Sequence, residues 1–259
     1  MDLDIRGRHA IVCAASKGLG KACAEALARE GVEVTINARE PETLAATAAE
    51  IRAATGVRVT VVTGDITLAE TRAALLAACP APDILINNNA GPPPGRFQDW
   101  DGTAWTRAFE ANMLAPIEMI RAVIDGMVER RFGRIVNITS AMVKAPQAPM
   151  GLSAGVRAGL TSACKALSLQ VAWANVTVNN ILPERIDTDR QVQMAQLSAA
   201  INGITVDEAY DKIRAHIPAG RLGQPREVGD ACAFLCGGHA GFITGQNLQL
   251  DGGAYPGLL

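Results

Sequence analysis

The sequence predicts a single Rossmann-fold α/β domain with a doubly wound, mostly parallel sheet and helices on both faces. Short apolar runs alternate with longer helix-like segments over residues 1–259, and no Pro-, Gly- or Ser-rich linker divides them. Hydrophobic residues make up 49% of the chain but aromatic residues only 4%, which indicates an aliphatic, Ala-rich interior. Repeated units of this kind place a ligand at the carboxyl ends of the strands.

Composition and charge argue against several classes of function. The net charge of -2 speaks against nucleic acid or an anionic membrane as the main partner, so we expect a small-molecule substrate. No apolar run approaches the roughly 20 residues of a membrane-spanning helix. The six cysteines are scattered without a signal peptide, which predicts reduced thiols in a cytoplasmic protein. Cys232 and Cys236 could suggest a metal pair, but no Cys or His partners stand at ligand spacing, so we expect no metal site.

The first unit has the pattern of strand, glycine-containing turn and helix. An apolar run at residues 9–13 is followed by AASKGLG and by KACAEALARE, which Gly31 closes. Backbone N–H groups and the positive end of the helix dipole can hold a pyrophosphate there, and Gly18 and Gly20 permit close approach. The alternative is a tight turn that binds nothing.

The second strand, at residues 32–37, ends where a dinucleotide fold meets the adenosine ribose. No acidic residue stands at its tip to bind the ribose hydroxyls of NAD. Arg39 and Lys17 instead offer two cations suited to a 2′-phosphate, so we predict NADP(H) over NAD(H). The alternative is that both are solvated surface cations.

The alternation then continues with the same regularity. The following segments are expected in chain order: a helix at 41–54, a strand from Val57, the pair Gly64-Asp65, another helix, a strand at 83–87, a strand at 134–140 and a long helix at 153–173. The long helix would carry Ser153 and Arg157 one turn apart on one face.

The segment NNNAGPPPG, at residues 87–95, begins a series of motifs that resembles the classical short-chain dehydrogenases/reductases. Residues 88–91 match the NNAG motif of that family, Asn112 falls where its structural Asn interrupts the fourth major helix, and Ser140 ends its fifth strand. Pro183 with Thr188 resembles its PG…T segment, and residues 243–253 resemble its closing strand. The resemblance covers essentially the whole chain.

The resemblance implies a set of functional positions. The catalytic positions would be Asn112, Ser140, Ser153 and Arg157. The cofactor would be held by Ser16, Lys17, Gly18, Leu19, Gly20, Arg39, Asp65, Ile66, Asn89, Ala90, Gly91, Pro183, Ile186 and Thr188. The family resemblance also implies a homo-oligomer, most simply a homotetramer, and residues 184–223 resemble the variable lid that covers the substrate.

Several residues at the expected cofactor and catalytic positions depart from the family pattern. The first Gly of the TGxxxGxG motif is Ala14, preceded by Cys13. Counting the family's spacing of 13 residues from Ser140 reaches Ser153 where the family has Tyr, and four more reach Arg157 where it has Lys. The family's Tyr donates a proton to the carbonyl, helped by the neighbouring Lys. Ser is a far weaker acid, and losing a positioned acid commonly costs about 10² to 10⁴ in rate.

Three further positions have open roles. Glu184 replaces the Gly of the PG motif and could be a general base, or could point to solvent or pair with Arg185 or Arg190. Tyr210 and Tyr255 are the only tyrosines; either could reach a site in an oligomer, although packing is the simpler role.

The sequence leaves three functions in competition. The chain resembles a divergent branch similar to acyl-carrier-protein ketoreductases, in which LSxxxR replaces YxxxK. We therefore expect an NADP(H)-dependent oxidoreductase acting on a carbonyl or alcohol. The alternatives are a lyase, hydratase or isomerase on the same scaffold, which would stabilise an enolate, and a catalytically silent binding subunit.

Overall fold

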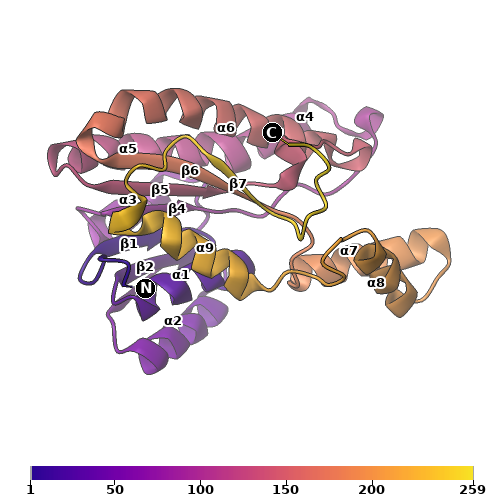
Figure 1. Ribbon diagram of the computed structural model, residues 1–259, viewed down its shortest axis with the longest axis horizontal. Helices are drawn as coiled ribbons and strands as arrows, with labels where there is room; N and C mark the ends of the chain where they lie inside the picture. Colours follow the sequence, from indigo (N-terminus) through magenta and orange to yellow (C-terminus); the bar gives the residue numbers. More distant parts are fainter. Residues whose placement is uncertain (1, 259) are drawn as a thin grey trace.

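Seven parallel strands form the centre of the molecule in the computed structural model, which describes residues 2–258 (Figure 1). The strand order in the sheet is β3-β2-β1-β4-β5-β6-β7. The strands are β1 (His9–Val12), β2 (Glu33–Ala38), β3 (Val59–Thr63), β4 (Ile84–Asn87), β5 (Gly133–Ile138), β6 (Val176–Pro183) and β7 (Asn247–Leu250). The predicted fold class is therefore confirmed.

Helices cover both faces of the sheet (Figure 1). One core lies between the sheet and α1 (Gly18–Arg29), α2 (Pro41–Thr55) and α9 (Pro225–Cys236). The other lies between the sheet and α3 (Ala69–Ala78), α5 (Ala115–Glu129) and α6 (Gly151–Val171). Both cores consist mainly of Ala, Val, Ile and Leu, so the aliphatic interior that the composition predicted is present. The strands read as continuous apolar runs because both of their faces are buried.

The helix that precedes β5 is interrupted. Helix α4 (Gly102–Phe109) begins after Asp101, whose side chain accepts a hydrogen bond from the backbone N–H of Ala104, and leads into a π turn at Glu110–Leu114 before α5 continues. Pro116, in the first turn of α5, has no N–H for the regular i→i−4 bond. The interruption that the resemblance predicted at Asn112 is therefore this π turn.

Two predicted boundaries near the expected active site are wrong. Strand β5 ends at Ile138, before Ser140, because the Ser140 hydroxyl accepts a hydrogen bond from the N–H of Met142 and caps a short 3-10 turn. Helix α6 begins at Gly151, two residues before Ser153. Ser153 therefore lies inside the first turn of α6, where the helix fixes its backbone.

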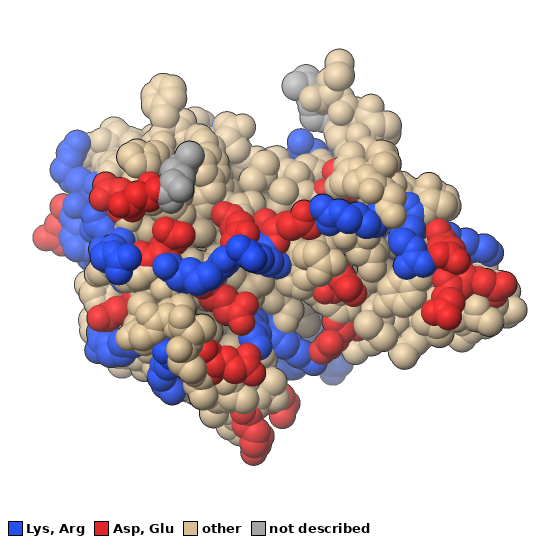
Figure 2. Space-filling view, turned by 60° about the horizontal axis from the view of Figure 1, so that its bottom comes forward, with Lys and Arg blue, Asp and Glu red and all other residues tan. Residues whose placement is uncertain are grey.

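Residues 184–223 contain α7 (Asp189–Asn202) and α8 (Val206–Ala215), which project away from the sheet (Figure 1). These two helices pack on each other through a small core of Ala195, Ala199 and Ala209. Figure 2 shows basic and acidic side chains intermixed over the visible face, consistent with the small net charge of -2. Among residues 2–258, no helix combines the length and apolarity that crossing a membrane requires.

Candidate functional site

The carboxyl ends of the strands meet along one edge of the sheet. The strand order reverses between β1 and β4, because β2 and β3 extend to one side of β1 while β5, β6 and β7 follow β4 on the other. Such a reversal opens a crevice outside the strand ends, which is where open α/β sheets bind ligands. The predicted site residues lie on the segments that leave these strand ends.

The glycine turn between β1 and α1 packs closely on itself and leaves the N-terminus of α1 without a side-chain cap. Gly18 has a φ of +58°, and a Cβ on Gly20 would lie only 2.3 Å from the carbonyl oxygen of Ala14. No side chain caps the first N–H groups of α1, whose N-cap residue is Lys17. Uncapped N–H groups at a helix N-terminus favour an anion such as a phosphate.

Ala14 adopts a φ of +47°, in the left-handed region that L residues seldom enter. Its carbonyl oxygen accepts a hydrogen bond from Nδ2 of Asn88 at 3.2 Å, which joins the glycine turn to the loop after β4. Burial raises the pKa of the neighbouring Cys13 thiol to about 12, so this thiol is neutral and inert. Asn88 was absent from the predicted site, although the NNAG motif contains it.

The loop after β4 is tied to two further elements. Asn89 donates from Nδ2 to the carbonyl of Ala111 in the π turn at 3.0 Å. Its own carbonyl accepts from Nη2 of Arg157 at 3.3 Å. The predicted cofactor residues Ala90 and Gly91 therefore stand on a loop held from both sides.

Arg157 is buried and makes most of its hydrogen bonds to backbone. Its Nη1 donates to the carbonyls of Ile138 and Thr139 at 2.9 and 3.1 Å, so it ties α6 to the end of β5. Burial lowers the pKa of Arg157 to about 10, and the nearby positive charge of Arg190 adds to this effect. The guanidinium is therefore protonated at neutral pH and rigidly held.

The hydroxyls of Ser153 and Ser140, two of the predicted catalytic residues, each accept a hydrogen bond from the protein. Ser153 Oγ accepts from Nε of Arg157 at 3.3 Å, and Ser140 Oγ accepts from the N–H of Met142 at 3.2 Å. A hydroxyl has one proton to donate, and neither acceptor role uses it. Both serines can therefore donate outward to a ligand oxygen, and the positive charge of Arg157 polarises Ser153.

Asn112 lies buried in the π turn. Its Nδ2 donates weakly to the carbonyl of Ala108 at 3.4 Å, while its Oδ1 is buried and has no donor within the described chain. A buried amide oxygen ordinarily has a partner.

The start of α7 reaches back to the sheet. The methyl group of Thr188 lies 3.8 Å from the position that a Cβ on Gly18 would take. Asp189 pairs with Lys17 at 3.0 Å, with both side chains mostly exposed. Arg190 donates from Nη2 to the carbonyl of Pro92 at 3.2 Å. The first turn of α7 therefore spans from the glycine turn to the loop after β4.

Other predicted cofactor residues are less closely joined. Arg39 is exposed at the tip of β2. Asp65 accepts hydrogen bonds from the N–H and hydroxyl of Thr67, so its carboxylate shapes its own turn, and Ile66 beside it is buried. Ile186, after Pro183, forms a parallel β-bridge to Gly223, which brings the two ends of the segment 184–223 together.

Glu184 lies half-buried beside a small cavity of about 110 Å³, which Asp251 also lines. Burial raises the pKa of Glu184, the nearby Arg185 opposes this, and Asp251 adds to it. An Oε1–Nε distance of 3.8 Å joins Glu184 to Arg185, one of the partners that the sequence allowed.

The two tyrosines lie next to cations. Tyr210, on α8, has the guanidinium of Arg214 at 5.9 Å from its ring centroid. Tyr255 has Nζ of Lys144 at 5.6 Å. Each contact is within the range of a cation–π interaction.

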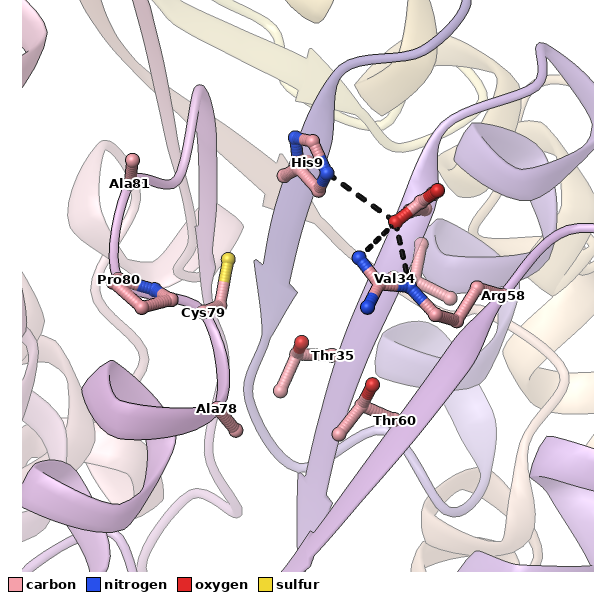
Figure 3. Close-up of a pocket in the computed structure, with 10 residues that line it drawn as sticks. His9, Val34, Thr35, Arg58, Thr60, Ala78, Cys79, Pro80 and Ala81 are labelled. Atoms are coloured by element: carbon pink, nitrogen blue, oxygen red, sulfur yellow. Dashed lines mark hydrogen bonds and ion pairs between the residues drawn. The ribbon is translucent and has the colours of Figure 1, made fainter.

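A separate cavity of about 310 Å³ opens at the amino ends of β1, β2 and β3 (Figure 3). Its wall carries His9 and Arg58, which both contact the carboxylate of Glu33. Ligands of this fold class bind at the opposite edge of the sheet, so this cavity is not our candidate site. In the part of the chain described, no three His, Cys, Asp or Glu side chains are placed to bind a metal.

Comparison with known proteins identifies relatives of the whole chain. A family model described as Enoyl-(Acyl carrier protein) reductase matches residues 13–255. The NADPH-dependent reductase BacG of Bacillus subtilis is 34% identical over 256 residues, covering 97% of this chain and 99% of the relative. The 3-oxoacyl-[acyl-carrier-protein] reductase FabG of Vibrio cholerae is 32% identical, covering 98% of this chain and 99% of the relative.

A solved structure gives the same picture. L-sorbose reductase from Gluconobacter frateurii, complexed with NADPH and L-sorbose, superimposes with a TM-score of 0.94 at 27% identity, covering 100% of both chains. BacG is named an NADPH-dependent reductase and the sorbose reductase was solved with NADPH, which agrees with the cofactor that Lys17 and Arg39 predicted. The chain therefore belongs to the short-chain dehydrogenase/reductase family, among the relatives of 3-oxoacyl-acyl-carrier-protein reductases.

Proposed function

We propose that this protein is an NADPH-dependent reductase of a carbonyl substrate in which Ser153 and Ser140 hold the carbonyl oxygen and no tyrosine supplies the proton. The single observation that carries this proposal is the hydrogen bond from Nε of Arg157 to Ser153 Oγ. It commits the oxygen of Ser153 to accepting, so that its proton is free for a ligand. NADPH-dependent reduction is also the activity named for BacG.

The residues at the crevice suit NADPH. The uncapped start of α1 fits a pyrophosphate. The exposed Arg39, together with Lys17, would contact a 2′-phosphate. Bound NADPH would supply a hydride. The remaining predicted contacts would come from Ser16, Gly18, Leu19, Asp65, Ile66, Asn89, Ala90, Gly91, Pro183, Ile186 and Thr188.

The two hydroxyls would act by stabilising developing negative charge. As hydride adds to the carbonyl carbon, the carbonyl oxygen becomes an alkoxide, to which Ser153 and Ser140 donate. Removing one such donor commonly lowers kcat by about 10² to 10³. Arg157 acts through Ser153 and is a positioning residue, because its Nη1 is already bound to backbone carbonyls.

The proton would come from solvent. A serine hydroxyl is too weak an acid to serve as the final source, so the alkoxide takes a proton from water and leaves hydroxide for the solvent to neutralise. The unpaired Oδ1 of buried Asn112 can accept a hydrogen bond from such a water. This role matches the predicted catalytic position.

A non-redox reaction with Glu184 as base is the second candidate. The raised pKa of the half-buried Glu184 favours it, since a raised pKa makes the carboxylate a stronger base toward a substrate proton. Its recorded partner is Arg185, however, and it lines the small cavity beside Asp251.

Deuterium transfer separates the two candidates. NADPH carrying deuterium at the hydride-donating carbon would be incubated with the protein and a panel of ketones and diketones. We expect deuterium on the carbinol carbon of an alcohol product, with one NADPH oxidised per alcohol formed. Substrate conversion without NADPH oxidation would favour the non-redox reaction.

A further inference from the structure

The first turn of α7 contacts two segments of the proposed site, the glycine turn and the loop after β4. Thr188 and Asp189 contact the glycine turn, through Gly18 and Lys17, whereas Arg190 contacts the other side through the carbonyl of Pro92. The side chain of Arg190 therefore binds the same loop to which Arg157 donates a hydrogen bond.

Two guanidinium groups bind opposite ends of one short loop. Nη2 of Arg157 donates to the carbonyl of Asn89 at 3.3 Å, and Nη2 of Arg190 donates to the carbonyl of Pro92 at 3.2 Å. Only Ala90 and Gly91 separate these acceptors. The two positive charges are near enough that Arg190 contributes to the lowered pKa of Arg157.

No carboxylate balances these charges within residues 2–258. Neither Arg157 nor Arg190 forms an ion pair there, since Asp189 pairs with Lys17 and no ion pair joins Asp187 to Arg190. Backbone carbonyls accept hydrogen bonds but carry no net charge. Holding two like charges together without a counter-ion is unfavourable, so the arrangement favours binding of an anion.

Several donors are still available to such an anion. A guanidinium has five N–H groups, of which Arg157 uses four on Ser153 and the three backbone carbonyls. Arg190 uses one on Pro92. Its planar group therefore keeps a free edge that can bind a carboxylate through two parallel hydrogen bonds.

We propose that Arg190 selects an anionic substrate: the ketone to be reduced carries a carboxylate or a similar anionic group, which Arg190 binds. This inference rests on the proposed reductase function and names its substrate class. Arg190 contacts the loop after β4 at Pro92, and Arg157 joins the same loop to Ser153. Lys17 and the start of α1 lie on the other side, where the proposed cofactor phosphates would bind.

The test compares an oxo acid with its methyl ester, which has the same carbon skeleton but no charge. Wild type should prefer the acid in kcat/KM. The Arg190→Met variant keeps the aliphatic stem and should lower kcat/KM for the acid by about ten- to a hundredfold while leaving the ester nearly unchanged. Arg190→Lys should recover part of the preference. Arg214→Met, which removes an exposed cation from α8, is the matched control and should leave both substrates unchanged.

Two binding measurements separate this inference from the reductase proposal. The affinity for NADPH, followed by its fluorescence, should be the same in wild type and Arg190→Met; weaker NADPH binding with unchanged acid-to-ester preference would overturn the inference and assign Arg190 to the cofactor. Oxamate, an unreactive isostere of a 2-oxo acid, should bind NADPH-loaded wild type and not Arg190→Met. If oxamate binds in this way but no ketone is reduced, the anion site is supported and the proposed reductase function is refuted. Equal oxamate binding by both proteins would overturn the inference.

Discussion

We propose that Ser153 stands where the family carries a tyrosine, and the surroundings of Ser153 bear on what that position can do. A tyrosine there would donate a proton of pKa about 10, which a neighbouring cation lowers further. Ser153 instead accepts a hydrogen bond from the buried Arg157. Its hydroxyl can donate a hydrogen bond to a ligand, but it is too weak an acid to transfer the proton itself. The role that we propose for Ser153 is therefore to stabilise an oxyanion, with water as the proton source.

The pH dependence of the reaction should reflect this difference. Burial lowers the pKa of Arg157 to about 10, so Arg157 is charged below that pH and loses its charge as the pH rises through it. We expect kcat/KM to be flat between roughly pH 6 and 9 and to fall above that range as Arg157 loses its charge.

Steady-state rates with a saturating cofactor would measure this profile. A rate that increases with pH through the raised pKa of Glu184 would contradict it, because a base must lose its proton before it acts.

Ala14 stores strain in the glycine turn. Because its φ is +47°, replacing it with Gly should remove the contact between Cβ and backbone that disfavours the left-handed region. We expect Ala14→Gly to raise the free energy of unfolding by about 1 kcal/mol, after allowing for the greater freedom of Gly in the unfolded chain. Thermal unfolding would measure it. Ala15→Gly, at a buried neighbour without positive φ, is the control and should be less stable than wild type.

At the scale of elements, the strands were largely predictable because each is a buried apolar run, and their alternation with helices fixed the order. The ends of β5 and α6 were not, because they depend on short turns that the apolar pattern does not reveal: the turn that Ser140 caps through Met142, and the turn at Ala148–Met150. The role of Arg157 was only partly predictable. Its position beside Ser153 follows from helical spacing, whereas its contacts with Ile138, Thr139 and Asn89 exist only after the strands assemble.

The tip of β2 should determine the choice between NADPH and NADH. Arg39 is exposed there with no acidic residue in its place, so Arg39→Ala should lower the preference for NADPH over NADH by about tenfold. Calorimetric titration of both cofactors would measure the affinities. Arg58→Ala is the matched control and should keep the preference. Arg58 pairs with Glu33 at the amino ends of the strands, away from the tip of β2. Equal affinity of wild type for both cofactors would refute the prediction.

At the scale of the whole molecule, apolar side chains are exposed on α6 and on the 3-10 turn that follows it at Ala172–Ala174. Such side chains indicate a surface that another subunit would bury. Leu169 and Trp173, one helical turn apart, are 73% and 66% exposed. We predict a homo-oligomer, most simply a tetramer, in which this face is buried. Light scattering should give a mass several times that of the 27.1 kDa chain, and Leu169→Glu with Trp173→Glu should reduce it.

Ile201→Glu, at a 73% exposed position on α7, serves as the control for adding a charge at an exposed apolar site. A wild-type protein that is monomeric at micromolar concentration would rule out the oligomer.

The most direct test of the account is the rate of NADPH oxidation by Ser153→Ala with an activated ketone in excess. The account predicts a loss of about 10² to 10³ in kcat, with unchanged NADPH affinity, because one donor to the oxyanion is removed. Ser168→Ala, which removes a buried hydroxyl of α6 that binds the carbonyl of Lys165, should keep the wild-type rate. A Ser153→Ala protein as fast as wild type would show that this hydroxyl does not hold the reacting oxygen.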